Sequence, residues 1–100
     1  MLTFAEPWHP CDDKGFEEEL RREVCRQHVL FRVDARVIAS RQDRDDFLFE
    51  LPHGRFALVH LTWKPERDAA WPFTRIYESA DEMQEAIRRD IEEWESSHGT

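Results

Sequence analysis

The sequence predicts a single α+β domain over residues 1–100, in which an antiparallel meander of three to four strands is flanked by an N-terminal and a C-terminal helix. Three observations support this prediction. Apolar residues recur at helical spacing near both ends of the chain, and the middle contains short β-type runs separated by turn residues. A chain of 100 residues has room for only one hydrophobic core.

The first predicted helix follows a segment with no clear period. Residues 1–11 contain prolines and aromatic residues, and we expect them to form an irregular arm over the core. An N-cap is expected at Asp12 or Asp13, and three apolar residues then recur at i, i+4 and i+8. This spacing predicts a helix over about 14–27.

The central part of the chain contains three strand-like runs, at 33–42, 46–51 and 55–63, with turn residues between them. Because tight turns join antiparallel neighbours, these runs predict a meander. The proline-containing loop 64–72 follows, and 73–77 is expected to form a short fourth strand.

The second hairpin predicts which side chains share a face of the sheet. If His53 and Gly54 form its turn, paired residues have numbers that sum to 107, so Phe47 lies opposite His60. Both faces are then mostly apolar, whereas a half-solvated sheet has one polar face. With the helices on one face, the other needs a cover from the arm, the loop or a second copy of the chain. The uncovered face predicts a homodimer.

The C-terminal helix is predicted by a capping box and an apolar stripe. Ser79 and Glu82 have the spacing at which the serine accepts a backbone hydrogen bond and the glutamate reaches back. Four apolar residues from Met83 to Trp94 follow at spacings of 4, 4 and 3, which places them on one side of a helix.

The charge composition argues against several classes of protein. The chain has 14 Lys+Arg against 22 Asp+Glu, a net charge of −8, and its basic residues are interleaved with acidic ones along the sequence. Nucleic-acid binding needs a clustered cationic surface, so no nucleic-acid partner is expected. No apolar run reaches the roughly 18 residues of a membrane span, and the start lacks a secretion signal. We therefore expect no membrane partner and a cytoplasmic location.

One set of residues resembles a metal site: His9, Cys11, Cys25 and His28. Zinc accepts thiolate and imidazole ligands, and residues three apart on a helix are neighbours. The spacing matches no established zinc finger, however. The alternative is that Cys25 is a small buried residue and His28 ends the helix. We expect no metal and no cofactor.

The candidate binding residues lie in the third strand and the segment after it: His60, Trp63, Arg67, Trp71 and Arg75. Tryptophan and arginine are common at binding hot spots, although both tryptophans could instead fill the core. The predicted register leaves His60 without a carboxylate partner. We therefore expect His60 to be a core histidine, or to form the floor of a ligand pocket, rather than to be catalytic.

Familiar catalytic motifs are absent from the sequence, including the phosphate-binding loop, the nucleophile elbow and the dinucleotide fingerprint. We therefore expect a small acidic non-enzymatic binding or assembly module. One alternative is a small-molecule-binding protein or minor enzyme with a pocket near His60, Trp63 and Trp71. Another is an immunity- or antitoxin-like protein that binds a basic partner through charge complementarity.

The run 56–63, Phe-Ala-Leu-Val-His-Leu-Thr-Trp, is followed by Trp71-Pro72 and later by Tyr77-Glu78-Ser79. From about Ala35 onward, this pattern resembles a group of small bacterial proteins that share a VHLTW-type strand and a final acidic helix. The resemblance implies a bacterial cytosolic protein. It implies no activity, cofactor or catalytic residue.

Overall fold

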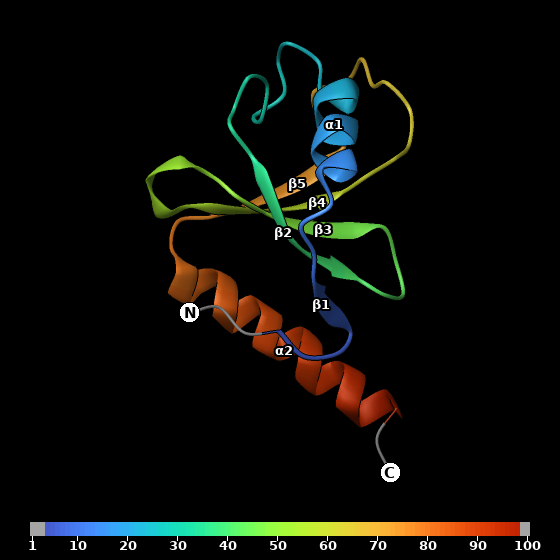
Figure 1. Ribbon diagram of the computed structural model, residues 1–100, viewed down its shortest axis with the longest axis vertical. Helices are drawn as coiled ribbons and strands as arrows, with labels where there is room; N and C mark the ends of the chain where they lie inside the picture. Colours follow the sequence, from blue (N-terminus) through green and yellow to red (C-terminus); the bar gives the residue numbers. More distant parts are fainter. Residues whose placement is uncertain (1–3, 99–100) are drawn as a thin grey trace.

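The computed structural model describes residues 4–98, which form a five-stranded antiparallel sheet between two helices (Figure 1). The strands are β1 (Trp8–Pro10), β2 (Arg36–Arg41), β3 (Asp46–Glu50), β4 (Phe56–His60) and β5 (Phe73–Tyr77). The helices are α1 (Lys14–Glu23) and α2 (Ala80–His98), with one 3₁₀ turn at Pro52–Gly54. The predicted α+β class, with a helix toward each end of the chain, is confirmed.

The N-terminal segment contains a strand that was not predicted. Trp8–Pro10 pairs with the end of β2, so the strand order is β1-β2-β3-β4-β5 and β1 is one edge of the sheet. The expectation of an irregular arm over residues 1–11 is therefore wrong at these three positions. Three residues are too few to show an alternating pattern, and the pairing depends on a strand some thirty residues away.

The hairpin between β3 and β4 has a register one residue away from the predicted one. Phe47 lies opposite Val59, not His60. The turn contains three residues, Pro52–Gly54, and is closed by the Leu51 N–H donating to the Arg55 carbonyl at 2.9 Å. His53 and Gly54 both have positive φ, at 65° and 72°. Because the loop is one residue longer than assumed, β4 presents its side chains on the opposite faces.

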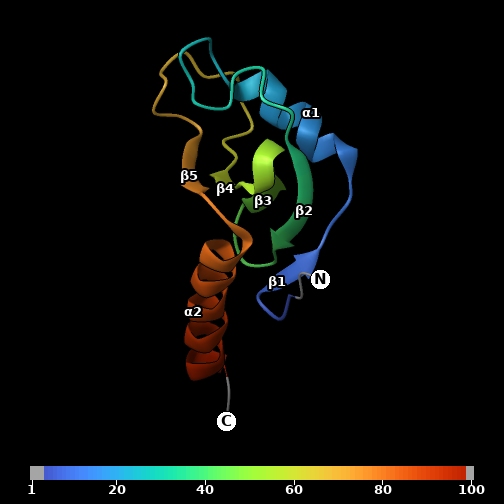
Figure 2. The same cartoon turned by 90° about the vertical axis from the view of Figure 1, so that its left-hand side faces the viewer.

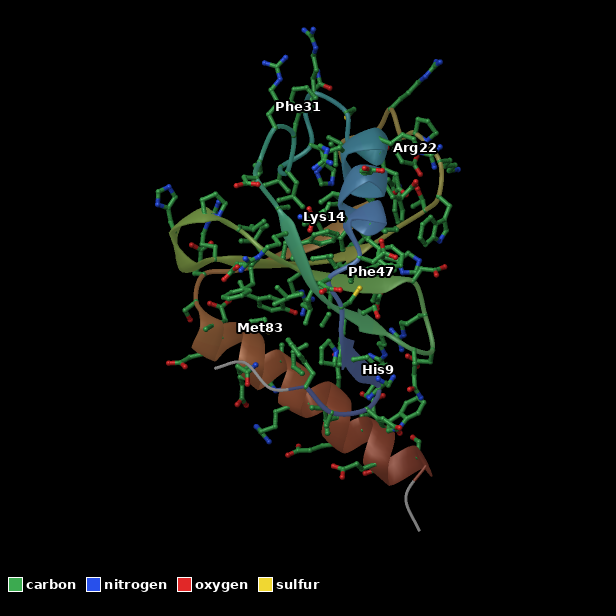
Figure 3. The ribbon with its side chains drawn as sticks, viewed as in Figure 1. His9, Lys14, Arg22, Phe31, Phe47 and Met83 are labelled. Atoms are coloured by element: carbon green, nitrogen blue, oxygen red, sulfur yellow. The ribbon has the colours of Figure 1, made fainter. Side chains whose placement is uncertain are left out.

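The observed register gives the sheet two apolar faces, and each is covered by one helix (Figures 1 and 2). Leu20 of α1 packs on one face, whose buried residues include Val37, Phe47, Phe49, Leu51, Ala57, Val59 and Leu61. Met83 and Ile87 of α2 pack on the other, with Trp8, Ala39, Leu48, Phe56 and Tyr77. Figure 3 shows Phe47 and Met83 on these opposite sides.

The sequence-based interpretation placed both helices on one face of the sheet. This is wrong, because α1 covers one face and α2 covers the other. The uncovered face that suggested a homodimer does not exist within residues 4–98, because α2 occupies it. The homodimer itself stays a prediction. In the described part of the chain, no helix is long and apolar enough to cross a membrane.

Helix α1 begins as predicted and ends early. The Asp13 carboxylate accepts from the Gly15 N–H at 2.9 Å, which caps the N-terminus. The predicted end near residue 27 is wrong, because the helix stops at Glu23 and the chain becomes extended. The Glu23 carbonyl accepts instead from the Glu66 N–H, at 3.0 Å. This donor lies in a loop far along the chain, so the helical spacing of apolar residues does not predict where the helix ends.

Helix α2 begins with the predicted capping residues. The Ser79 hydroxyl accepts from the Glu82 N–H at 3.1 Å. The Glu82 carboxylate reaches back one residue further than a standard capping box and accepts from the Glu78 N–H at 3.3 Å. Both bonds satisfy backbone donors at the start of the helix.

Candidate functional site

A groove of about 580 Å³ lies between α2 and strands β3–β5, and we call it the α2 groove. Six charged side chains line it: Arg41, Arg44, Asp46, Arg75, Arg89 and Asp90. Four ring-bearing side chains line it as well: His60, Trp71, Phe73 and Tyr77. Four arginines and two aspartates therefore line the groove, and two further carboxylates, Asp43 and Glu85, reach Arg41 and Arg89 from beside it.

The register of the sheet aligns the side chains of the groove. His60 of β4 lies opposite Asp46 of β3 and opposite Phe73 of β5, and Leu58 lies opposite Arg75. Paired residues of neighbouring strands point to the same face. Asp46, His60 and Phe73 therefore form one row across the sheet, and Arg75 lies in the next row.

His60 is held by a buried carboxylate. Its Nδ1 lies 2.7 Å from Oδ1 of Asp46, whose residue exposure is 6%. This contact makes Nδ1 the protonated nitrogen of the neutral ring and leaves Nε2 available to a ligand. The predicted lack of a carboxylate partner is wrong, because the shifted register brings Asp46 directly opposite His60.

Arg41 has a structural role in the groove wall. Its Nε lies 2.6 Å from Oδ1 of Asp43, and its Nη1 lies 3.6 Å from Oδ2 of Asp90. The same Asp90 oxygen accepts from Nε1 of the buried Trp8 at 3.1 Å. Through these contacts Arg41 and Asp90 tie β1 and β2 to α2.

The other three arginines form only long ion pairs, or none, with carboxylates of the described residues. Arg44 reaches Asp46 and Arg89 reaches Glu85 at 3.8 Å each, which is near the limit of an ion pair. Arg75 forms no ion pair with a carboxylate of residues 4–98, and it lies close enough to Tyr77 to act on the pKa of that hydroxyl. The guanidinium groups of these residues can therefore still bind an anion.

Tyr77 adds a neutral hydroxyl to the groove. Burial raises the pKa of this hydroxyl above its usual value, and the nearby charge of Asp90 raises it further. Arg75 acts in the opposite direction. At neutral pH the hydroxyl is protonated, so it can donate to a bound anion.

The structure gathers three of the five predicted binding residues. His60, Trp71 and Arg75 line the α2 groove, and Trp63 and Arg67 do not. Trp63 lies on the α1 face, with its ring centroid 6.2 Å from those of Phe16 and of Phe47. Arg67 is exposed on the loop before β5.

Nine groove residues lie outside the predicted set, and six of them have polar side chains: Arg41, Arg44, Asp46, Tyr77, Arg89 and Asp90. They come from five different strands, loops or turns of helix and have no characteristic spacing. Alternation along β5 relates Tyr77 to Arg75, and this was the one available signal.

The four metal-ligand candidates do not form a site. His28 is buried, and both its nitrogens are occupied: Nε2 donates to the Pro72 carbonyl at 2.9 Å, and Nδ1 accepts from the Leu30 N–H at 3.0 Å. The His9 ring contacts the side chain of Gln42. Among residues 4–98, no three His, Cys, Asp or Glu side chains are grouped so that they could hold a metal ion.

A second polar cluster lies under α1, where Glu23 is completely buried. Its carboxylate accepts from the Thr62 N–H at 2.9 Å, the Thr62 hydroxyl at 3.1 Å and the Trp63 N–H at 2.7 Å. Trp63 has a φ of 64°, a left-handed conformation that bulky residues rarely adopt. The Glu23 carboxylate therefore stabilises the strained segment Thr62–Trp63, which follows β4.

Burial raises the pKa of Glu23 to about 7, and the neighbouring carboxyl of Glu19 contributes in the same direction. The three bonds from Thr62 and Trp63 lower the pKa but do not offset these effects. Near neutral pH, Glu23 is therefore only partly ionised. The helical spacing does carry a signal for this glutamate, because Glu23 follows Leu20 by three residues and Phe16 by seven and so lies on the same side of the helix.

The chain matches no described protein family, no curated protein and no solved structure. The resemblance to small bacterial proteins with a VHLTW-type strand accordingly supplies no function. Function has to be inferred from the α2 groove itself.

Proposed function

We propose that the protein is a non-enzymatic binding module that holds an anionic group of its ligand in the α2 groove. One observation carries this proposal: four of the twelve arginines line a single groove, although the chain has an excess of eight acidic residues. Arginine binds carboxylate and phosphate groups through paired N–H donors, and it is the residue best suited to this role.

Arg75 is the central anion-binding residue in this proposal. It projects from β5 beside Leu58, between the row that contains His60 and the hydroxyl of Tyr77. Its own charge is not neutralised by a carboxylate of residues 4–98. An anion placed on Arg75 would also have the Tyr77 hydroxyl as a donor.

Two exposed aromatic residues support a ligand that has an apolar part as well as a charge. Trp71 is 46% exposed and Phe73 is 45% exposed, and both line the groove. An apolar ring contacting them would be removed from water, whereas the arginines would hold the charged end.

The test uses phenyl phosphate, with benzylamine as a cation carrying the same ring. We expect phenyl phosphate to bind and to shift the backbone NMR signals of β4, β5 and α2. Arg75→Gln should weaken binding about tenfold or more, because a hydrogen bond to a charged group is lost. Arg67→Gln is the matched control on the loop outside the groove. Equal binding of both compounds, or an affinity that Arg75→Gln leaves unchanged, would overturn the proposal.

The Asp46–His60 hydrogen bond favours a second candidate, in which His60 acts as a base on a ligand held by Arg75. The test is hydrolysis of phenyl phosphate and phenyl acetate by wild type and His60→Gln. Turnover that is lost in the variant would support acid–base chemistry. A wild-type rate equal to that of buffer would refute it.

The homodimer and the basic protein partner stay predictions. A basic partner would bind a surface other than the α2 groove, because four arginines line the groove and Arg75 has no ion pair with a carboxylate of residues 4–98. Acidic side chains on the exposed side of α2, such as Glu92 and Glu93, would be available to it.

A further inference from the structure

We infer that the occupant of the α2 groove is an acidic protein segment in extended conformation, which adds to the sheet as a sixth strand beside β5. This inference rests on the proposed function, because it names the ligand class of the same groove. It depends on two neighbouring features: an unpaired strand edge, and an arginine at the middle of that edge with no carboxylate partner.

The outer edge of β5 is open. β5 is the last strand of the sheet and pairs only with β4, and Figure 2 shows it at the margin of the sheet. Its five residues form no other backbone hydrogen bond with residues 4–98. Alternate N–H and C=O groups of such an edge point outward and are free to pair with another chain.

The two edges of the sheet differ in how they are protected. β1 has only three residues and ends in Pro10, so it offers little to a further strand. β5 has five residues and contains neither proline nor lysine, which are common protections of an edge. The contrast points to β5 as the edge at which a segment is added.

The side chains of β5 select an acidic segment. Arg75 lies at the centre of the strand on the groove side, and Arg89 of α2 lines the same groove. A strand that pairs with β5 places its own side chains next to Arg75, where a glutamate or aspartate forms a cross-strand ion pair. The exposed rings of Trp71 and Phe73 are available to neighbouring apolar side chains.

The other face of β5 also fits a partner strand. Thr74 and Ile76 point toward the α1 side, and Ile76 packs against the buried cluster there. An incoming strand with apolar residues at alternate positions would extend that surface. The matching pattern is therefore acidic side chains toward the groove and apolar side chains toward the α1 side.

A second copy of the chain fits the edge less well. Antiparallel pairing of two β5 strands about their centre would place Arg75 opposite Arg75, and like charges directly opposite each other destabilise a sheet. Each chain also carries a net charge of −8, so the two copies repel. An acidic segment from another protein instead neutralises the arginines.

The test uses a capped octapeptide with glutamate at every second position and valine between, and a lysine–valine peptide as its counterpart. We expect the glutamate peptide alone to bind. Hydrogen exchange of alternate β5 amides should become slower in the complex. Arg75→Gln should weaken binding about tenfold or more, and Arg67→Gln should leave it unchanged.

N-methylation of the peptide tests the strand pairing directly. In an extended strand, successive N–H groups point to opposite edges, so methylating the glutamate amides blocks one edge and methylating the valine amides blocks the other. Antiparallel addition uses one edge, and the two methylated peptides should therefore differ in affinity about tenfold or more.

The results separate this inference from the proposed function. Equal affinities of the two methylated peptides, with the dependence on Arg75 retained, would overturn strand addition and leave anion binding in place. Binding of phenyl phosphate without binding of the glutamate peptide would do the same. Failure of both ligands would overturn both proposals. Slow β5 exchange in a dimer without peptide would assign the edge to a second copy and overturn the inference.

Discussion

Replacing Glu23 by glutamine should remove a large part of the pH dependence of stability. Glu23 is completely buried, and its pKa rises from 4.5 to about 7 on folding, chiefly because burial disfavours the charged form. The folded protein therefore binds a proton at this site more tightly than the unfolded chain does. This contribution to the free energy of unfolding is fully present below pH 4.5 and is lost as the pH rises through 7.

The size of the effect follows from the two pKa values. Between pH 5 and pH 8, a carboxyl with a pKa of 4.5 unfolded and about 7 folded loses on the order of 2 to 3 kcal/mol of stability. Glutamine does not ionise in this range, so the difference in unfolding free energy between wild type and Glu23→Gln should change by an amount on the order of 2 to 3 kcal/mol, in favour of the variant at high pH.

The assay is urea denaturation of both proteins at pH 5, 6, 7 and 8. Using the difference between the two proteins cancels the titration of groups that they share. Glu18→Gln is the matched control, because Glu18 is exposed on the same helix, and it should keep the wild-type pH profile. Parallel profiles for wild type and Glu23→Gln would show that the pKa of Glu23 is not raised and would refute the reasoning.

Three further predictions concern the groove and its supports. Asp46→Asn should change which nitrogen of the His60 ring carries the proton, because the carboxylate that accepts from Nδ1 is lost. ¹⁵N NMR of the imidazole detects this as a change in the tautomer signals. An unchanged spectrum would mean that Asp46 does not orient the ring. Trp8→Phe should lower the free energy of unfolding by about 1 kcal/mol or more, because the Nε1 hydrogen bond to α2 is lost. Trp71→Phe, at an exposed ring, should cost much less in the same urea titration, and equal losses would contradict this assignment. Ser79→Ala should destabilise the protein by about 1 kcal/mol through loss of the N-cap, and an unchanged urea midpoint would show that the cap contributes nothing.

The helices show how far local sequence carries a prediction. The caps at Asp13 and Ser79 and the stripe that contains Met83 and Ile87 involve residues within one or two turns of each other, so their spacing was enough. The early end of α1 was not accessible in this way, because the Glu23 carbonyl and carboxylate bind the segment 62–66.

The register of the sheet shows where the same approach failed. His53-Gly54 resembles a two-residue turn, but the chain uses three residues, with a left-handed conformation at His53 that its residue type does not demand. An error of one residue exchanged the faces of β4. It thereby concealed the contact between Asp46 and His60. The apparently uncovered face had another cause, the assumption that both helices pack on one side of the sheet.

The sequence by itself determined the α+β class, the two capped helices, the meander and three residues of the candidate site: His60, Trp71 and Arg75. Only the tertiary structure decided which helix covers which face, that Asp46 orients His60, and that Arg41, Arg44 and Arg89 join Arg75 in one groove. The physical reason is the range of the interactions. Caps and periodicity act over a few residues, whereas strand register and the gathering of like charges depend on contacts between segments far apart in the chain.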